Sequence, residues 1–103
     1  MLNAAQKTAL RKAIRLINSK NWIQGTLALD KTDRIVSPKS KRAVRWCAEG
    51  ALRKYCSKSR VADRLLALYE DKYVAELYDF NDRGRMTADK VKKHLREFLH
   101  GNV

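Results

Sequence analysis

Long apolar runs are missing from this sequence of 103 residues. No stretch approaches the roughly 20 consecutive apolar residues that a helix needs to cross a bilayer. The N-terminal segment 1–17 is charged and amphipathic, and it lacks the apolar core and the small-residue cleavage site of a secretory signal. We therefore expect a protein that does not insert into membranes and that works in the cytoplasm.

Cysteine is also scarce, since the chain contains only Cys47 and Cys56. If one helix carries both, the nine-residue spacing separates them by about 13 Å along the axis, at about 1.5 Å per residue. A disulfide needs Cα atoms within about 7 Å, so we expect no intrachain bond and a reducing compartment. The same spacing is poorly suited to a tetrahedral zinc site with His94 and His100. We expect no metal and no cofactor.

Acidic residues are few in the first part of the chain. Residues 1–60 contain 15 Lys and Arg against 3 Asp and Glu, whereas residues 61–103 contain 8 of each. The net charge of +12 therefore comes entirely from the first 60 residues. A one-sided field of this size indicates a polyanionic partner, which is nucleic acid, an acidic protein surface or anionic lipid.

Helical spacing of apolar residues is the main structural signal. Segments 4–19, 38–56, 60–75 and 88–99 each place an apolar stripe opposite charged residues. An apolar fraction of 45% suits a folded chain, and the length suits a single domain over residues 1–103. The sequence predicts a mainly α fold: a compact bundle of about four helices, with a small irregular or β-hairpin insert after the first helix.

The expected insert covers residues 22–36. Gly25 opposes a helix there, residues 30–33 are typical of a turn, and Ile35 and Val36 predict a short return strand, with a plain loop as the alternative. A second loop is expected at residues 80–87, where Asn, Asp and Gly gather.

Local signals also predict where helices begin and how one of them packs. Asn3 with Gln6 forms a capping-box pattern, and Thr87 is positioned to cap the last helix. Ser37 followed by Pro38 predicts the start of the second helix. Gly50 inside that helix costs about 1 kcal/mol relative to Ala, which indicates that another backbone packs close to it.

Several short motifs resemble a family of small phage and actinobacterial proteins of unknown function. The match runs from about Leu10 to Leu99, and its most specific part is the Trp-Cys-x-x-Gly-Ala-Leu segment 46–52. The resemblance implies a phage or prophage accessory protein, but it carries over no functional residue. Its motif positions are Asn21, Trp22, Ile23, Gln24, Gly25, Ala28, Asp30, Pro38, Ala43, Val44, Arg45, Trp46, Cys47, Gly50, Ala51, Leu52, Asn81, Asp82, Arg85, Thr87, Val91 and Leu95.

Two clusters invite a chemical interpretation. Cys47 is a nucleophile only if a base such as His94 or His100 lowers its pKa, and the alternative is a small buried apolar side chain. Asn81 and Asp82, with two nearby arginines, suggest a catalytic or phosphate-binding loop, and the alternative is a turn that bonds its own backbone. The sequence contains no glycine-rich phosphate loop and no carboxylate pair at active-site spacing. We expect a non-enzymatic protein, with a cysteine-dependent enzyme as a remote alternative.

The basic surface is the strongest functional signal. Lysine and arginine neutralise phosphates and supply most non-specific affinity for nucleic acid. Trp46 or Trp22 is a possible aromatic anchor on that surface, and the alternative for Trp46 is packing against the insert, with Glu49 bridging Arg45 and Arg53. The predicted binding residues are Lys39, Lys41, Arg42, Arg45, Arg53, Lys54, Lys58, Arg60 and Arg64, with a second row of Lys7, Arg11, Lys12 and Arg15 on the first helix.

These observations favour a small basic binding protein that contacts nucleic acid mainly through phosphates, with little reading of base sequence. The alternative is a host-directed or anti-defence protein that binds an acidic host protein or nucleoprotein through the same basic face. If the protein is phage-encoded, the expected location is the cytoplasm of the host cell.

Overall fold

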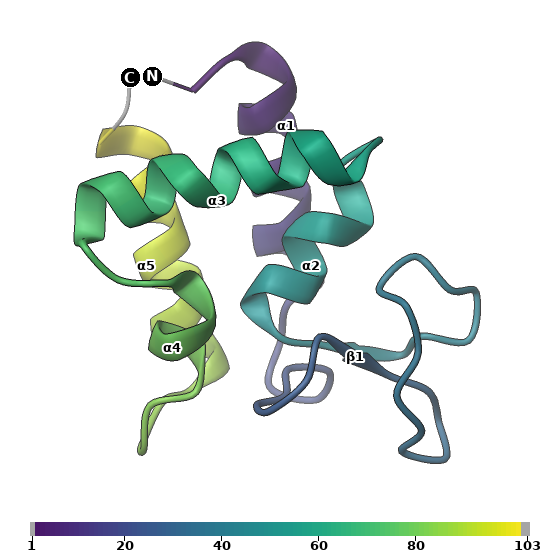
Figure 1. Cartoon of the computed structure of the whole chain (residues 1–103). Coiled ribbons are helices and arrows are strands. Elements are labelled where there is room, and N and C mark those ends of the chain that lie inside the picture. Colours follow the sequence, from purple (N-terminus) through teal and green to yellow (C-terminus); the bar gives the residue numbers. More distant parts are fainter. Residues whose placement is uncertain (1, 102–103) are drawn as a thin grey trace.

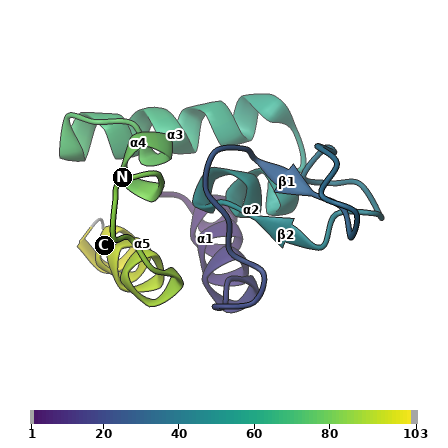
Figure 2. The same ribbon diagram turned by 90° about the horizontal axis from the view of Figure 1, so that it is seen from below.

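The computed structural model describes residues 2–101 and confirms a mainly α fold. The described chain measures 39 × 30 × 20 Å along its principal axes. Helix α3 runs across the direction of α1, α2 and α5, and a long loop projects from one end beyond the two short strands (Figures 1 and 2). The elements are α1 (Ala4–Leu16), β1 (Ala28–Leu29), β2 (Arg45–Trp46), α2 (Ala48–Tyr55), α3 (Ser59–Tyr73), α4 (Leu77–Asn81) and α5 (Ala88–Gly101).

The capping-box prediction for α1 is confirmed. The Asn3 side chain accepts a hydrogen bond from the backbone of Gln6, and the Gln6 side chain accepts one from the backbone of Asn3, both at 2.8 Å. The helix ends at Leu16 rather than at residue 19, because Ile17 adopts an extended conformation and leads into the insert.

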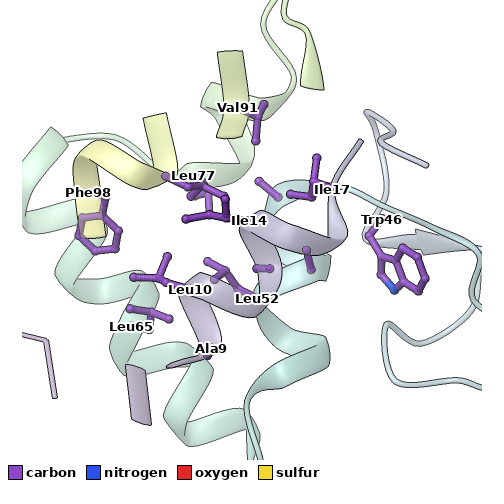
Figure 3. Close-up of a cluster of buried hydrophobic side chains, with 14 of the residues drawn as sticks. Ala9, Leu10, Ile14, Ile17, Trp46, Leu52, Leu65, Leu77, Val91 and Phe98 are labelled. Carbon is purple, nitrogen blue, oxygen red and sulfur yellow. The ribbon is translucent and has the colours of Figure 1, made fainter. Parts of the chain in front are cut away.

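The hydrophobic core forms where α1 meets α2, α3 and α5. Four core side chains are each at most 1% exposed: Leu10 of α1, Ile17 just after α1, Leu52 of α2 and Leu65 of α3. Figure 3 shows these side chains converging with residues of α4 and α5, while Trp46 lies to one side near the strands. Each such side chain contributes about 1.5–3 kcal/mol when buried, so this contact holds the helices together.

The expected insert is confirmed as a small antiparallel pair of strands, although its partner strand is not the predicted one. Ala28 pairs with Trp46 and Leu29 with Arg45. Ile35 makes only an isolated bridge to Leu29, so the return strand predicted at Ile35 and Val36 is absent from the described structure as a named element. Residues 30–44 instead form a long loop between β1 and β2.

The prediction of a helix over residues 38–56 is wrong in its first half. Residues 37–43 form successive turns, in which the Ser37 and Ser40 hydroxyls accept hydrogen bonds from the nearby backbone. The backbone then extends, since Val44 N donates to Leu29 O at 2.9 Å and Cys47 N donates to Leu27 O at 3.1 Å. These long-range bonds outweigh local helix propensity, and α2 begins only at Ala48.

The C-terminal half agrees with prediction except for one short helix. Helix α3 ends at Tyr73, and its C-cap residue, Val74, has a left-handed conformation with φ 53°. The loop expected at residues 80–87 starts later than predicted, because α4 occupies its first two positions. Thr87 caps α5 as predicted, with its hydroxyl accepting from Lys90 N at 3.2 Å. No helix among residues 2–101 is long and apolar enough to cross a membrane.

Candidate functional site

Exposed cations gather at the end of the molecule formed by the 30–44 loop and the first turns of α3. Both segments lie on the same side of the molecule in Figures 1 and 2. A pocket of about 280 Å³ joins them, with Lys39 on the loop side and Lys58 at the start of α3. We call this surface the loop end, and its basic residues are Lys31, Arg34, Lys39, Lys41, Arg42, Lys58, Arg60 and Arg64, all exposed.

The loop end contains a hollow of about 480 Å³ between two turns of the 30–44 loop. Lys31 and Arg34 line one part of it, and Lys41 and Arg42 line another. The sequence prediction missed Lys31 and Arg34 because it counted the dense run of cations only over residues 39–64. Residues 31–42 contain five cations within twelve residues, and this charge density is the signal that would have included them.

Among the described residues, Asp30 is the carboxylate that lines this hollow, and it stabilises the turn. Asp30 Oδ1 accepts from Thr32 N and Thr32 Oγ1 at 2.8 Å and from Arg34 N at 2.9 Å. These bonds, the strongest from Arg34 N, hold the pKa of Asp30 below its usual value of 3.8. They confirm the predicted turn, and the Lys31 and Arg34 side chains beside Asp30 are exposed.

Two of the predicted cations are paired with carboxylates. Arg45 forms an ion pair with Asp33, and Arg53 contacts Glu49 at 2.8 Å and Asp63 at 3.0 Å. The predicted bridge from Glu49 to Arg53 is therefore confirmed, but among the described residues Glu49 makes no ion pair with Arg45. Both arginines are half-buried, so they offer less charge to a ligand than the exposed residues of the loop end.

The predicted row on α1 divides between two sides of that helix. Lys12 approaches the ring of Tyr55 at 5.9 Å, and Lys54 of α2 approaches the same ring at 5.6 Å. Arg11 and Arg15 instead border a groove beside α5. Lys7, the remaining member of the row, is half-buried. The structure therefore does not bring the thirteen predicted residues into one continuous face.

The prediction that Trp46 lies on a charged helical face is wrong. Trp46 belongs to β2, is only 7% exposed, and its indole Nε1 donates to Pro38 O at 3.0 Å. Trp22 is half-buried, and its Nε1 donates to Asn81 Oδ1 at 2.7 Å. Both indole N–H groups are occupied within the fold, so Trp46 packs on the insert, as the alternative interpretation had it, and is not a free stacking surface.

Asn81 joins the insert to the helices. It is fully buried, and its Oδ1 also accepts from Ala48 N at 2.9 Å. Its Nδ2 donates to Ile23 O and to Asp82 Oδ1, both at 3.0 Å. Four hydrogen bonds thus satisfy this amide, which explains its burial. The Asn81 and Asp82 pair was predicted to be a phosphate loop or a self-bonded turn, but it makes long-range contacts to the insert.

The neighbouring motif residues complete this connection. Gln24 Nε2 donates to Asn81 O at 3.0 Å and to Arg83 O at 2.9 Å. Gly25 N donates to Asp82 Oδ1 at 3.0 Å, and Gly25 has a φ of 87°, which glycine adopts without strain. The Trp-x-Gln-Gly and Asn-Asp motifs, 57 residues apart, are therefore two halves of one structural contact.

Gly50 confirms the predicted close backbone approach. A Cβ at this position would lie 1.9 Å from Leu27 O and 2.8 Å from Leu27 C. Both are backbone atoms of the segment leading into β1, so they have little room to move. Gly50 therefore lets α2 pack directly on the insert.

Cys47 is buried, as the structural interpretation expected, but it lies before α2 rather than on its apolar stripe. Its Sγ accepts from Gly50 N at 3.3 Å as the N-cap of the helix. Burial raises the pKa of the thiol to about 11, so it is protonated at neutral pH. Cys56, at the other end of α2, is also a free buried thiol, and burial raises its pKa.

His94 lies in an aromatic cluster rather than beside Cys47. Its ring stacks on Phe80 at 3.8 Å, and its Nε2 is 2.6 Å from Tyr69 Oη. Burial lowers the pKa of His94 from 6.5 and raises the pKa of Tyr69 to about 12. Within residues 2–101, no group of three or more His, Cys, Asp or Glu side chains is arranged to hold a metal ion.

Comparison with known proteins identifies a family but no function. Neither the curated proteins nor the solved structures gave a match. The model of a family of unknown function, DUF6197, matches residues 1–98. This match covers nearly the whole chain and includes both halves of the Trp22 and Asn81 contact. The protein therefore belongs to DUF6197, a family of unknown function.

Proposed function

We propose that the protein binds nucleic acid through the phosphates, and that the loop end is the contact surface. The observation that carries the proposal is the gathering of eight exposed lysines and arginines from the 30–44 loop and α3 at one end of the molecule. Exposed cations displace condensed counterions when they neutralise phosphates, and this release drives binding.

This mechanism requires that the loop present its cations to the phosphate backbone, and it does not require contacts to the bases. The 30–44 loop is held at its base by the hydrogen bonds of Asp30 and by the pairing of β1 with β2. Lys and Arg side chains on such a platform follow a phosphate backbone without reading base edges. The buried position of Trp46 argues against base stacking at that residue, so we infer little dependence on nucleotide sequence.

We infer that this function is non-enzymatic. A thiolate nucleophile requires a lowered pKa, whereas burial raises the pKa of Cys47 to about 11. His94 contacts the rings of Phe80 and Tyr69, whereas the Cys47 thiol bonds Gly50 N, and these contacts support the inference. The family resemblance supports a phage accessory protein that acts in the cytoplasm of its host, and that context forms part of the proposal.

The proposal is tested by fluorescence anisotropy with labelled single- and double-stranded DNA and RNA at about 50 and 200 mM salt. For six or more phosphate contacts, affinity falls by about 10³-fold or more over this range. Lys41→Glu/Arg42→Glu is expected to abolish most of the binding at low salt. The matched control is Lys20→Glu/Lys93→Glu, which changes the net charge equally at exposed sites outside the loop end. Equal losses in both variants, or no binding by wild type at 50 mM, would refute the proposal.

A second candidate is supported by two exposed apolar side chains within the loop end. Ile35 is 76% exposed and Val44 is 43% exposed. Phosphate contacts do not need them, whereas a protein interface combines apolar anchors with a charged rim. The alternative function is therefore binding to an acidic host protein or nucleoprotein. Ile35→Ser separates the two, because it leaves nucleic-acid affinity unchanged but weakens capture of a protein partner.

A further inference from the structure

The groove between α1 and α5 is a second place where cations gather. Arg11 and Arg15 of α1 form one wall, and Arg96 and His100 of α5 form the other. Each pair is spaced by four residues, which puts its members on the same face of their helix. The volume of the groove is about 330 Å³. Figure 2 shows α1 between α5 and the 30–44 loop, so this groove is separate from the loop end.

The floor of the groove is apolar and well packed. Ile14 and Leu99 line it and are only 6% and 4% exposed. These two side chains belong to the core, so the helices that carry the arginines have a fixed spacing. A ligand therefore meets three arginines and one histidine, carried by two helices whose spacing is fixed.

Within the described residues, no carboxylate balances the positive charge of the groove. No aspartate or glutamate lines it, and none of its three arginines makes an ion pair within residues 2–101. Arg11 and Arg15 carry like charges four residues apart on one helix, and such charges repel each other. This situation differs from that of Arg45 and Arg53, which are both paired with carboxylates. An anion in the groove would relieve the repulsion.

We propose that the α1–α5 groove is a binding site for a phosphate group. Arginine suits this ligand because its planar guanidinium donates two parallel hydrogen bonds to phosphate oxygens. Arginines on opposite walls contact one phosphate from two sides, and the His100 ring adds a further donor. The phosphate belongs either to a monoester, such as a nucleotide or inorganic phosphate, or to the diester backbone of a nucleic acid. The site does not require the loop end to bind nucleic acid.

The experiment measures thermal stability with three probes: inorganic phosphate, a nucleoside 5′-monophosphate, and an oligonucleotide without terminal phosphates. Sodium chloride at equal ionic strength is the reference. A ligand present at ten times its Kd raises the melting temperature of a domain this size by roughly 5–10 °C. Arg15→Gln/Arg96→Gln removes one charge from each wall and is expected to abolish this shift. Lys20→Gln/Lys93→Gln, at exposed positions outside the groove, is the matched control and keeps the shift.

The outcomes distinguish a phosphate monoester from a nucleic-acid backbone as the ligand, and one of them refutes the proposed site. A groove-dependent shift with inorganic phosphate or the monophosphate assigns the site to monoesters. Groove dependence with the oligonucleotide alone assigns it to the nucleic-acid backbone. If no probe gives a shift that Arg15→Gln/Arg96→Gln removes, the site is refuted. That result leaves the proposed function standing, because Lys41→Glu/Arg42→Glu tests the loop end separately. If Arg15→Gln/Arg96→Gln melts at the same temperature as wild type in sodium chloride, its fold is intact.

Discussion

Replacing Asn81 by alanine tests whether the family motifs are structural. The substitution leaves the N–H groups of Trp22 and Ala48 and the carbonyl of Ile23 without their partner. A buried polar group left unpaired costs about 1–3 kcal/mol. Ala48 is fully buried and takes a value near the middle of that range, about 2 kcal/mol. Half-buried Trp22 and Ile23 can recruit water, so each takes the lower end, about 1 kcal/mol. We expect Asn81→Ala to lower the free energy of unfolding by about 4 kcal/mol, out of a total of about 5–15 kcal/mol.

Urea unfolding followed by tryptophan fluorescence measures this loss. With a slope of about 2 kcal/mol per molar, the midpoint moves down by roughly 2 M. Asp79→Ala, an exposed change on the same short helix, is the control and stays within about 0.5 kcal/mol of wild type. Trp22→Phe removes one of the donors, so the double variant with Asn81→Ala loses less stability than the sum of the two single changes. An Asn81→Ala variant within about 1 kcal/mol of the control, or strict additivity, would refute the structural role of the motif.

Three further predictions concern the core. Gly50→Ala destabilises by about 1–3 kcal/mol or more, because its Cβ meets the Leu27 backbone, whereas Gly84→Ala, which has open space, changes the urea midpoint little. The His94 pKa is lowered on folding, so stability is fully present above pH 6.5 and falls as the pH drops toward the folded pKa. Melting curves between pH 7 and 5 should show this loss in wild type and much less of it in His94→Phe. Native Cys47 reacts with iodoacetamide at pH 8 far more slowly than the urea-unfolded chain, and equal rates would contradict its burial.

Local signals were sufficient to predict three of the helices. The Asn3 capping box, the Thr87 cap and the apolar stripes of α1, α3 and α5 depend on residues a few positions apart, and the structure agrees with them. The start of α2 could not be obtained in this way. Ser37 and Pro38 resemble a helix start, but the backbone of residues 44–47 pairs with Leu27 and Leu29, and that pairing has no local signature.

Charge density along the chain predicted a basic surface, but not which of its residues are exposed or how they are grouped, since Arg45 and Arg53 are half-buried. The ion pair of Arg45 with Asp33 depends on the strand register, and the division of the α1 row depends on where α5 packs. Asn81 is the clearest case of missing information. Its amide looks like that of an ordinary turn, and only its partner 59 residues away, Trp22, shows that it is a buried connection.

The salt dependence of binding tests the central claim, that the loop end holds a phosphate backbone, most directly. The logarithm of Kd for a labelled duplex is measured against the logarithm of salt concentration, for wild type and for Lys41→Glu/Arg42→Glu. Each lost phosphate contact reduces the steepness of the line by about 0.9. We expect a steep line for wild type and a line with a slope shallower by about 2 for the variant, with weaker binding at 50 mM. Parallel lines of equal affinity, or a wild-type line without slope, would contradict it.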